Sequence, residues 1–511
     1  MNNRTVRFIL LCLMLIALIF PNTKVSAETS FITYSGSIDG KKLHVYKFAT
    51  SSEGMVNIED LGTSSSLITY QLVSEDSKTE YVSGDVLPAG TYLFKVNSDD
   101  TNTGKYSFKL SGIQFLGTPD NSLPTLNVTN PTGSLVRLSK GTSTINLTGS
   151  TNGTQASVSV NKVNYSLAGN FTKTVNLKYG LSTINFKAVN SNGNMVFESH
   201  QVIAPGYKRL DGTNRYAVSA NISKEIDEFR GLEEVDKTII LSNDSAFADA
   251  LSGVTIAAKE KAPILLTSAT NGIPSEVKTE IERLKSNKAI ILGGEGSVAV
   301  STEDELRALG VTSIERITGT NRYEVATNIA KKIITQDTDT AFIASGESFP
   351  DALSVASIAG QLQIPLLTTN SSNLSAEVKT FLANNPQINH FVISGGSVSS
   401  TVENQLKTYG TVSRISGSNR FEVAENAANA FNIIPNTITV ANGMDFPDAL
   451  TGGVLSALSK GPLLLATPTS TPIETLRYFE KYSLDINNFY ILGGTGSVSN
   501  DTINKLYPYI Q

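Results

Sequence analysis

Three short turns in the sequence each carry an arginine that could bind an anion. They are GTNRYAVS (212–219), GTNRYEVA (319–326) and GSNRFEVA (417–424). A guanidinium presents a planar fork of N–H donors that matches a phosphate or a carboxylate. Three such forks in one chain could hold a repeating polyanion, because many weak contacts add up through multivalency. The candidate ligand-binding residues of these turns are Asn214, Arg215, Asn321, Arg322, Asn419 and Arg420.

A second shared motif places an aspartate at the predicted start of a helix. It reads FADALSG (247–253), FPDALSV (349–355) and FPDALTG (446–452), and its candidate ligand residues are Asp249, Asp351 and Asp448. A carboxylate at a helix start can accept first-turn amide hydrogens and meet the positive end of the helix dipole. We expect capping more than ligand contact, since capping needs no partner. Another interpretation stays open, in which each Arg pairs with one of these Asp residues and joins repeat to repeat.

Glycine pairs follow a predicted strand in each copy. They are Gly293 and Gly294, Gly395 and Gly396, and Gly493 and Gly494. A tight turn there needs positive φ, which glycine adopts without strain, and its backbone amides could approach a phosphate. The pairs lack the third glycine and the later acid of a dinucleotide site, so we predict no nucleotide role. The second copy reads GGSV where the others read GGEGSV and GGTGSV, which puts ligand binding by its turn in question.

The composition and the remaining reactive side chains argue against several classes of function. The formal net charge of −5 does not favour nonspecific nucleic-acid binding, which needs an excess of Lys and Arg. The three His residues, at 44, 200 and 390, share no spacing, and the single cysteine is Cys12. No zinc pattern or nucleophile elbow is found. We therefore predict a non-enzymatic protein without a cofactor or a metal site.

The elements that must position these motifs recur in the same order in all three copies. After each arginine turn, apolar residues stand at helical spacing. Short apolar runs follow, such as KTIILSND (237–244), and further helical stretches separate them. The order is helix, strand, helix, strand, helix, strand, helix. Because the strands are apolar without alternation, we expect a parallel sheet that is buried on both faces.

These motifs together resemble the type 2 cell-wall-binding repeats of Gram-positive surface proteins. The resemblance covers roughly residues 207 to 511. The first copy departs from it at Ala248, where the other two copies have a proline, Pro350 and Pro447. It implies Rossmann-like α/β units that pack with pseudo-threefold symmetry. It also implies non-covalent binding of an anionic secondary wall polymer, a polysaccharide or a teichoic-acid-like chain.

The rest of the chain is predicted to be a leader and two all-β domains. Residues 1–27 have the charged start, apolar run and small residues of a signal peptide. Residues 28–117 resemble the β-sandwich found at the ends of secreted peptidases, and 120–204 resemble bacterial immunoglobulin-like domains. The predicted repeats are 207–313, 314–411 and 412–511. No second apolar stretch long enough to cross a bilayer follows.

The sequence therefore predicts an exported protein of a Gram-positive cell wall or surface that displays its β domains. No membrane contact is expected after signal cleavage. Two alternatives remain open. One is a peptidoglycan hydrolase or a modifier of a wall hydrolase, and the other is an adhesin whose β domains bind a protein partner.

Overall fold

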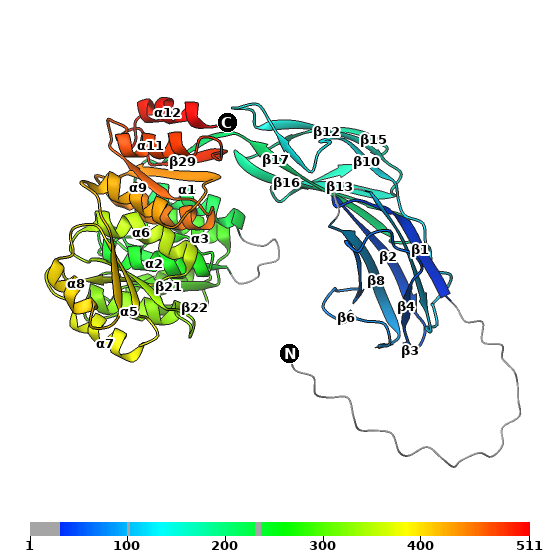
Figure 1. The fold of residues 1–511 in the computed structure, drawn as a ribbon, viewed down its shortest axis with the longest axis horizontal. Coiled ribbons are helices and arrows are strands. Elements are labelled where there is room, and N and C mark those ends of the chain that lie inside the picture. Colours follow the sequence, from blue (N-terminus) through cyan, green and yellow to red (C-terminus); the bar gives the residue numbers. More distant parts are fainter. Residues whose placement is uncertain (1–30, 100–102, 230–236) are drawn as a thin grey trace, which may run out of the picture. The chain divides into compact units, whose positions relative to one another are not determined.

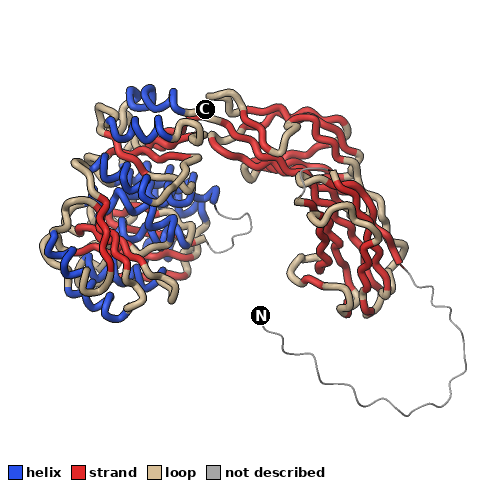
Figure 2. Tube along the Cα trace, in the orientation of Figure 1, coloured by secondary structure: helices blue, strands red, loops and turns tan. Residues whose placement is uncertain are grey.

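The computed structural model describes residues 31–99, 103–229 and 237–511, so the predicted signal peptide lies outside the described residues. The chain divides into two compact units. One holds residues up to 124 together with 189–197, and the other holds 125–188 and 198–511. Strands dominate up to residue 210, and helices alternate with strands after it (Figure 2). Within the described ranges, no helix combines the length and the apolar character needed to span a bilayer.

The first unit contains the N-terminal β domain (Figure 1). Its strands are β1 (Phe31–Ile38), β2 (Lys42–Thr50), β3 (Gly54–Met55), β4 (Asn57–Asp60), β5 (Ile68–Ser74), β6 (Glu80–Tyr81), β7 (Val86–Leu87), β8 (Gly90–Ser98) and β9 (Gly104–Ser111). One sheet has the order β1-β9-β4, and β2, β8, β5 and β6 pair in another. Alternate residues of β9 are buried, as expected for a strand with one face on the core. The all-β prediction for this region is confirmed.

The second unit begins with another set of strands. They are β10 (Leu126–Asn130), β11 (Leu135–Arg137), β12 (Thr144–Thr151), β13 (Gln155–Val160), β14 (Val163–Leu167), β15 (Asn170–Asn176), β16 (Gly180–Val189) and β17 (Met195–Ala204). The order β10-β12-β15 forms one sheet, and β14, β13, β16 and β17 are neighbours in another. Ile184, Phe186 and Ala188 of β16 are fully buried between polar neighbours. This alternation is the reason that the sequence reads as β structure.

The α/β region contains three successive sets of elements. The first is β18 (Gly206–Leu210), α1 (Arg215–Ile226), β19 (Thr238–Asn243), α2 (Phe247–Lys259), β20 (Ile264–Thr267), α3 (Ser275–Leu284), β21 (Lys288–Leu292) and α4 (Ser301–Ala308). The second is β22 (Ser313–Ile317), α5 (Arg322–Ile333), β23 (Thr340–Ser345), α6 (Phe349–Leu362), β24 (Leu366–Thr369), α7 (Ala376–Asn384), β25 (His390–Ser394) and α8 (Ser400–Leu406). The third is β26 (Thr411–Ile415), α9 (Arg420–Ala430), β27 (Thr437–Asn442), α10 (Pro447–Leu458), β28 (Leu463–Ala466), α11 (Ile473–Lys481), β29 (Asn488–Leu492) and α12 (Asn500–Leu506). We call these three sets, which begin at β18, β22 and β26, repeats 1, 2 and 3.

Each repeat is built on a four-stranded sheet whose strands run parallel. The orders are β20-β19-β21-β22, β24-β23-β25-β26 and β28-β27-β29-β18. Every residue of β19 is buried, which agrees with a strand covered on both faces. The predicted order of elements and the predicted parallel sheets are confirmed.

The edge strand of each sheet belongs to the segment that leads into a different repeat. Strand β22 pairs with β21 in the first sheet and then leads to α5 of repeat 2. Strand β26 likewise joins the second sheet and leads to α9. Strand β18 leads to α1 of repeat 1 but pairs with β29 of repeat 3, from Gly206 opposite Asn488 to Leu210 opposite Leu492. The three repeats are therefore linked in a closed ring.

The central helices α2, α6 and α10 each pack against the other two. Helices α2 and α6 are labelled in Figure 1. Gly360 of α6 lies so close to its neighbours that a Cβ there would stand 3.1 Å from Ala457 and 3.2 Å from Ala258. At the N-terminal ends of these helices the rings of Phe247, Phe349 and Phe446 meet, with centroids 5.4 to 6.1 Å apart. Small residues and aromatic rings thus fill the space that the ring of repeats encloses.

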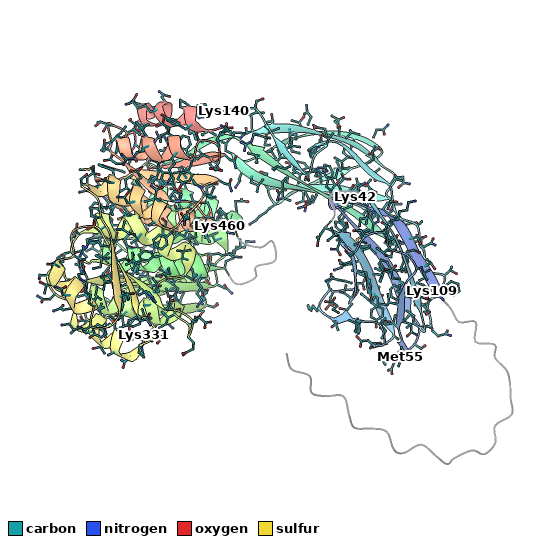
Figure 3. The ribbon with its side chains drawn as sticks, viewed as in Figure 1. Lys42, Met55, Lys109, Lys140, Lys331 and Lys460 are labelled. Carbon is teal, nitrogen blue, oxygen red and sulfur yellow. The ribbon has the colours of Figure 1, made fainter. Side chains whose placement is uncertain are left out.

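Strands of the second all-β region contact the end of repeat 3 within the second unit. Arg137 Nη2 donates to Asn487 Oδ1 at 2.6 Å. Lys140, labelled in Figure 3, donates to the carbonyl of Tyr507 at 3.3 Å, and its ammonium lies 5.2 Å from the centre of the Tyr507 ring. These contacts hold the last residues of repeat 3 against the segment that leads into β12.

Because β18 pairs with β29, a substitution in β18 is expected to destabilise the sheet of repeat 3. Leu210 is 3% exposed and lies opposite Leu492. Leu210→Ala is expected to lower the free energy of unfolding by about 2–4 kcal/mol through the cavity it leaves. Hydrogen exchange should lose protection in β29, although Leu210 lies nearly 280 residues away in sequence. In the matched variant Ile317→Ala, protection should fall in β21 instead. Loss of protection confined to α1 after Leu210→Ala would contradict the exchange.

Candidate functional site

The arginine turns follow directly on the exchanged edge strands. Each strand ends four residues before the Asn of its turn, so the turn lies over the carboxyl end of the sheet of the neighbouring repeat. Carboxyl ends of parallel strands are where α/β units usually bind ligands. The site is therefore assembled at the contact between two repeats, which we call a seam. Seam 1–2 joins repeat 1 to the turn of repeat 2, seam 2–3 joins repeat 2 to the turn of repeat 3, and seam 3–1 joins repeat 3 to the turn of repeat 1.

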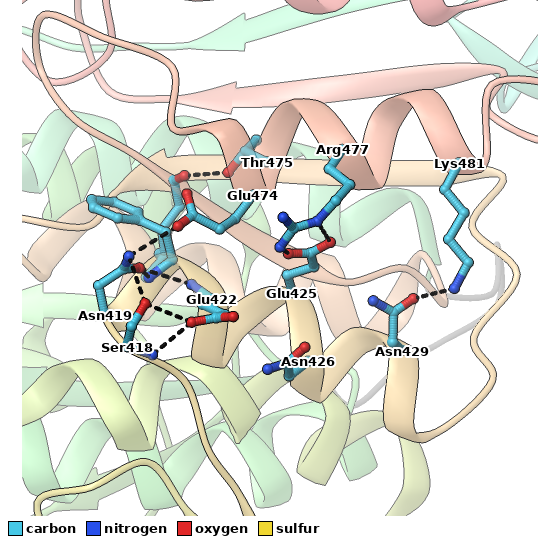
Figure 4. Close-up of polar contacts among 12 residues, drawn as sticks. Ser418, Asn419, Glu422, Glu425, Asn426, Asn429, Glu474, Thr475, Arg477 and Lys481 are labelled. Carbon is cyan, nitrogen blue, oxygen red and sulfur yellow. Dashed lines mark hydrogen bonds and ion pairs between the residues drawn. The ribbon is translucent and has the colours of Figure 1, made fainter.

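The asparagine of each turn is an N-cap in extended backbone conformation. Asn419 Oδ1 accepts hydrogen bonds from the amides of Phe421 and Glu422, both at 2.9 Å. Its Nδ2 donates to Glu474 on α11 at 2.9 Å, as Figure 4 shows. Asn321 likewise accepts from two amides and donates to Glu377. Asn214 accepts from the amide of Ala217 and donates to Glu276. Both ends of each amide are thus engaged inside the protein, and the asparagines position the turns.

In repeats 2 and 3 an acid stands three residues after the cap and reaches back toward it. Glu422 accepts the amide hydrogen of Ser418 at 2.6 Å, and Glu324 accepts that of Thr320 at 2.6 Å. Hydrogen bonds from the hydroxyl and the amide of Ser418 hold the pKa of Glu422 below its usual value, and those from the amide and the hydroxyl of Thr320 lower the pKa of Glu324. The contact is made with the residue before the cap rather than with the cap itself. It fixes the start of each turn, and repeat 1 lacks it because Ala217 stands at this position.

The arginine side chains extend from the turns across the seams. Arg322 Nη1 donates to the carbonyl of Gly346 at 2.5 Å, and its guanidinium lies 5.7 Å from the ring centre of Phe247 in repeat 1. Arg420 makes the same contacts with Gly443, at 2.6 Å, and with Phe349 of repeat 2, at 5.7 Å. One terminal nitrogen of each fork is held by a carbonyl. The guanidinium planes thus rest on an aromatic face, which orients them.

Arg215 differs in its partner. Its Nη1 lies 3.3 Å from the carbonyl oxygen and 3.6 Å from the carboxylate of Asp244, and its side chain is 37% exposed. In the described part of the chain, no ion pair joins these arginines to Asp249, Asp351 or Asp448. The interpretation in which Arg–Asp pairs join the repeats is therefore wrong. The repeats are instead joined by strand pairing at all three seams and by guanidinium–aromatic contacts at seams 1–2 and 2–3.

The aspartates of the second motif do not cap their helices, contrary to our expectation. Helices α2, α6 and α10 have no hydrogen bond from a side-chain cap. The reason is positional, because Asp249 and Asp351 are the third residues of their helices and Asp448 is the second. Their carboxylates face the glycine turns instead. Asp351 Oδ2 accepts the amide hydrogen of Ser397 at 3.0 Å.

The first glycine of each pair leaves room for this carboxylate. Gly293, Gly395 and Gly493 have φ of +104°, +70° and +86°, which confirms the predicted positive φ. A Cβ at these positions would lie 2.9, 2.0 and 2.2 Å from an atom of the facing aspartate. Both the backbone conformation and the space therefore require glycine. Neither reason is a contact with a ligand.

Burial sets the charge of the aspartates. Asp249 is 7% exposed, and burial raises its pKa to about 6 against the attraction of Arg322, which lowers it. Oδ1 of Asp249 has no hydrogen-bond partner among the described residues. Burial also raises the pKa of Asp448, where the hydroxyl of Ser497 donates to Oδ2 at 3.0 Å and acts in the opposite direction. A buried carboxylate without a partner is costly, so such groups often mark functional sites.

Three further arginines hold the glycine turns and were not singled out in the sequence. Nη1 of each donates to the carbonyl of the first glycine: Arg209 to Gly493 at 2.8 Å, Arg316 to Gly293 at 3.2 Å and Arg414 to Gly395 at 2.7 Å. Each stands six residues before the arginine of the turn, in KRLDGTNR, ERITGTNR and SRISGSNR. That constant spacing is the signal that could have identified them. Since they lie on the edge strands, they tie the turn of one repeat to the next.

Two seams enclose pockets. The pocket at seam 1–2 has a volume of about 460 Å³ and is lined by Phe247, Asp249, Gly294, Ser297 and Arg322, among others. The pocket at seam 3–1 has a volume of about 270 Å³, and its lining includes Asn214, Arg215, Asp448, Gly494 and Ser497. The predicted site residues are thus brought together, but between repeats rather than within one. Each pocket is lined by an arginine from one repeat and by an aspartate and glycines from its neighbour.

A protein-family model identifies the repeats. The model for cell wall binding domain 2 matches residues 209–303, 316–403 and 414–503, which is more than half of the chain. The chain belongs to the cell wall binding domain 2 family. The resemblance to type 2 cell-wall-binding repeats is confirmed, and wall association through the tandem repeats follows from it.

Two curated proteins of Bacillus subtilis (strain 168) are similar to part of the chain. N-acetylmuramoyl-L-alanine amidase LytC is 32% identical over 300 residues, which are 58% of this chain and 58% of that protein. The amidase enhancer is 28% identical over 330 residues, which are 64% of this chain and 45% of that protein. The chain thus spans about half the length of the curated relatives it matches.

Two solved structures from Clostridium difficile share the fold. Cwp8 matches with a TM-score of 0.54 and 26% identity, over 65% of this chain and 60% of that one. Cwp6 matches with a TM-score of 0.57 and 20% identity, over 76% of this chain and 68% of that one.

The buried carboxylate of Asp249 predicts a pH-dependent stability. Folding raises its pKa from 3.8 to about 6, so the folded protein binds more protons between these values. The free energy of unfolding therefore falls as the pH rises through this window, and the cost is complete at pH 7. Asp249→Asn should raise stability at pH 7 by on the order of 2–3 kcal/mol and flatten the slope between pH 4 and 6. Thermal unfolding at several pH values measures both effects.

Asp304→Asn is the matched control, because Asp304 has an 84% exposed side chain on α4. It should change neither the melting temperature nor the slope appreciably. If Asp249→Asn behaved like this control, the carboxylate of Asp249 would be solvated and the argument from its burial would fail.

Proposed function

We propose that the repeats hold the chain non-covalently on an anionic secondary polymer of a Gram-positive cell wall. The carrying observation is the pair of seam pockets, each lined by an arginine of one repeat and by the glycine turn of its neighbour. A phosphate or carboxylate of the polymer meets the free edge of Arg322 or Arg215, and the turn amides lie on the opposite wall. The N-terminal β domains are the part that is displayed.

The proposed assembly has approximate threefold symmetry. We infer it from the ring of edge strands and from the packing of α2, α6 and α10, which each contact the other two. Each unit is a Rossmann-like α/β repeat with its pocket at the carboxyl end of the sheet. A repeating polymer can engage more than one pocket of such a ring, so weak individual contacts combine into firm retention.

The net charge of −5 opposes binding of a polyanion at long range. That repulsion is screened beyond about 8–10 Å at physiological salt. Inside a pocket the local charges decide, and at seam 1–2 the guanidinium of Arg322 is oriented by the ring of Phe247 in the neighbouring repeat. The proposed binding is therefore local recognition of anionic groups rather than general electrostatic attraction.

A second candidate function is favoured by the two curated relatives, whose names are those of an amidase and an amidase enhancer. On this proposal the chain acts on a wall hydrolase or is one itself. A zymogram on purified walls separates the two candidates, because the anchoring function predicts no clearing band from this chain alone. A clearing band, or a faster release of wall fragments when the chain is added to an amidase, would favour the second candidate.

The anchoring function predicts a selective loss in Arg322→Ala. Retention on purified Gram-positive walls in a sedimentation assay should fall at least about tenfold, since one of the combined contacts is removed. The melting temperature should change by only a few degrees, because the lost bond to Gly346 and the contact with Phe247 are together worth about 1–2 kcal/mol. Walls extracted with acid, which removes polymers other than peptidoglycan, should retain neither protein.

Arg307→Ala is the matched control, an arginine that is 57% exposed on α4 with surface ion pairs only. It should bind walls like the unmodified chain. Equal retention on extracted walls would point to peptidoglycan itself as the ligand and would overturn the proposed polymer.

A further inference from the structure

The three seams are not equivalent, because the glycine turn of repeat 2 is shorter. The turn GGSV (395–398) lacks two residues that GGEGSV (293–298) and GGTGSV (493–498) contain. In the long turns the serine amide closes the turn itself, with Ser297 donating to Gly294 at 2.9 Å and Ser497 to Gly494 at 3.0 Å. In the short turn the amide of Ser397 instead donates to Asp351, at 3.0 Å. The short turn thus supplies a partner to the carboxylate that it faces.

In seam 1–2 the corresponding carboxylate is left without such a partner. Oδ1 of Asp249 and Oγ of Ser297 are both buried, and neither has a hydrogen-bond partner among the described residues. Both side chains belong to residues that line the pocket beside Arg322. A buried acceptor of this kind is satisfied when a donor enters. The pocket therefore offers a place for a hydroxyl or N–H group next to a place for an anion.

Seam 3–1 has the same long glycine turn as seam 1–2. The strand before each second motif ends in Asn243 or Asn442, whereas repeat 2 has Ser345 there. Among the described residues, Asp448 accepts a hydrogen bond from a side chain, the hydroxyl of Ser497 at 3.0 Å, and it lines a pocket with Arg215. A side-chain hydroxyl can rotate to another partner, whereas a backbone amide fixed in a turn cannot. Seams 1–2 and 3–1 can thus both accept a donor from a ligand.

We propose that seams 1–2 and 3–1 are the two sites that grip the wall polymer, and that the short turn closes seam 2–3. Each open seam takes a sugar unit with one anionic group for the arginine and one hydroxyl or amide N–H group for the aspartate. This inference rests on the proposed wall-binding function and makes it more specific. A polyanion that lacks donors, such as polyphosphate, leaves the aspartate unsatisfied and adds charge beside it, so it is a poor ligand.

A measurement without any ligand tests the closed seam. Asp351→Ala removes the acceptor of the Ser397 amide and should lower the folding equilibrium constant about tenfold. Asp249→Ala removes a carboxylate whose Oδ1 has no partner and should raise this constant at pH 7. Chemical denaturation of the mature chain gives both values. If the two variants shifted in the same direction by the same amount, the seams would be equivalent and the inference would be overturned.

Wall sedimentation tests the number of gripping sites. Arg215→Ala and Arg322→Ala should each weaken binding to purified walls at least tenfold, while Arg420→Ala should weaken it at most about twofold. Deletion of Glu295 and Gly296, which gives repeat 1 the short turn, should weaken it as much as Arg322→Ala. Equal losses in the three arginine variants would overturn the two-site inference and leave wall binding intact. Failure of the unmodified chain to sediment with walls would overturn the proposed function instead, without affecting the denaturation results.

Competition tests the class of ligand. The polymer released from walls by acid should displace the bound chain, and polyphosphate at the same concentration of negative charge should displace at least tenfold less. If polyphosphate competed equally well, the aspartate would take no part in recognition, and the proposed donor contact would be wrong.

Discussion

The pairing of each edge strand with the sheet of another repeat is the constraint on which the site depends. Because β22 completes the first sheet before the chain enters α5, the turn that contains Arg322 cannot lie anywhere but over the carboxyl end of that sheet. The same pairing, made by β18 with β29, brings the start of the first repeat to the end of the last. A ring is closed in this way without a covalent link. Each pocket therefore needs two repeats, and a single repeat would present half a site.

Electrostatics within the seams follow from this division between repeats. The cationic fork comes from one repeat and the buried carboxylate from its neighbour, yet the two form no direct ion pair in the described chain. Direct pairing would satisfy both charges and leave nothing for a ligand. Instead the guanidinium rests on an aromatic ring, while the carboxylate of Asp249 is kept at a cost that its raised pKa reflects. Stability given up in this way is a common feature of binding sites.

Sequence reasoning succeeds here where a residue type and a local period determine the outcome. Apolar strands, helix starts at Asn321 and positive φ at Gly395 follow from steric and hydrogen-bonding preferences that act over a few residues. The strand pairing at the seams cannot be predicted in this way, since no local preference determines that β22 pairs with β21 of the preceding repeat. Asp249 illustrates the consequence, because its motif predicts a cap while tertiary contact turns its side chain to a glycine turn. The arginines that hold those turns, such as Arg316, were missed for the same reason.

Because one unit occurs three times, the three seams can be compared with one another directly. Three copies placed in the same ring start from the same contacts, so a difference in contact can be traced to a difference in sequence. The turn of repeat 2 is two residues shorter than the other two. The amide of Ser397 therefore donates to the carboxylate of Asp351, whereas the serine amides of the long turns donate to Gly294 and Gly494 within the turn. The hydrogen bond from Ser397 has two opposing effects. It lowers the free-energy cost of burying the carboxylate of Asp351, and it occupies an acceptor that a ligand could otherwise use. In the proposed function, the two seams whose aspartates lack a backbone hydrogen bond in the described part of the chain hold the polymer. The third seam, where Asp351 is bonded to Ser397, contributes to stability alone.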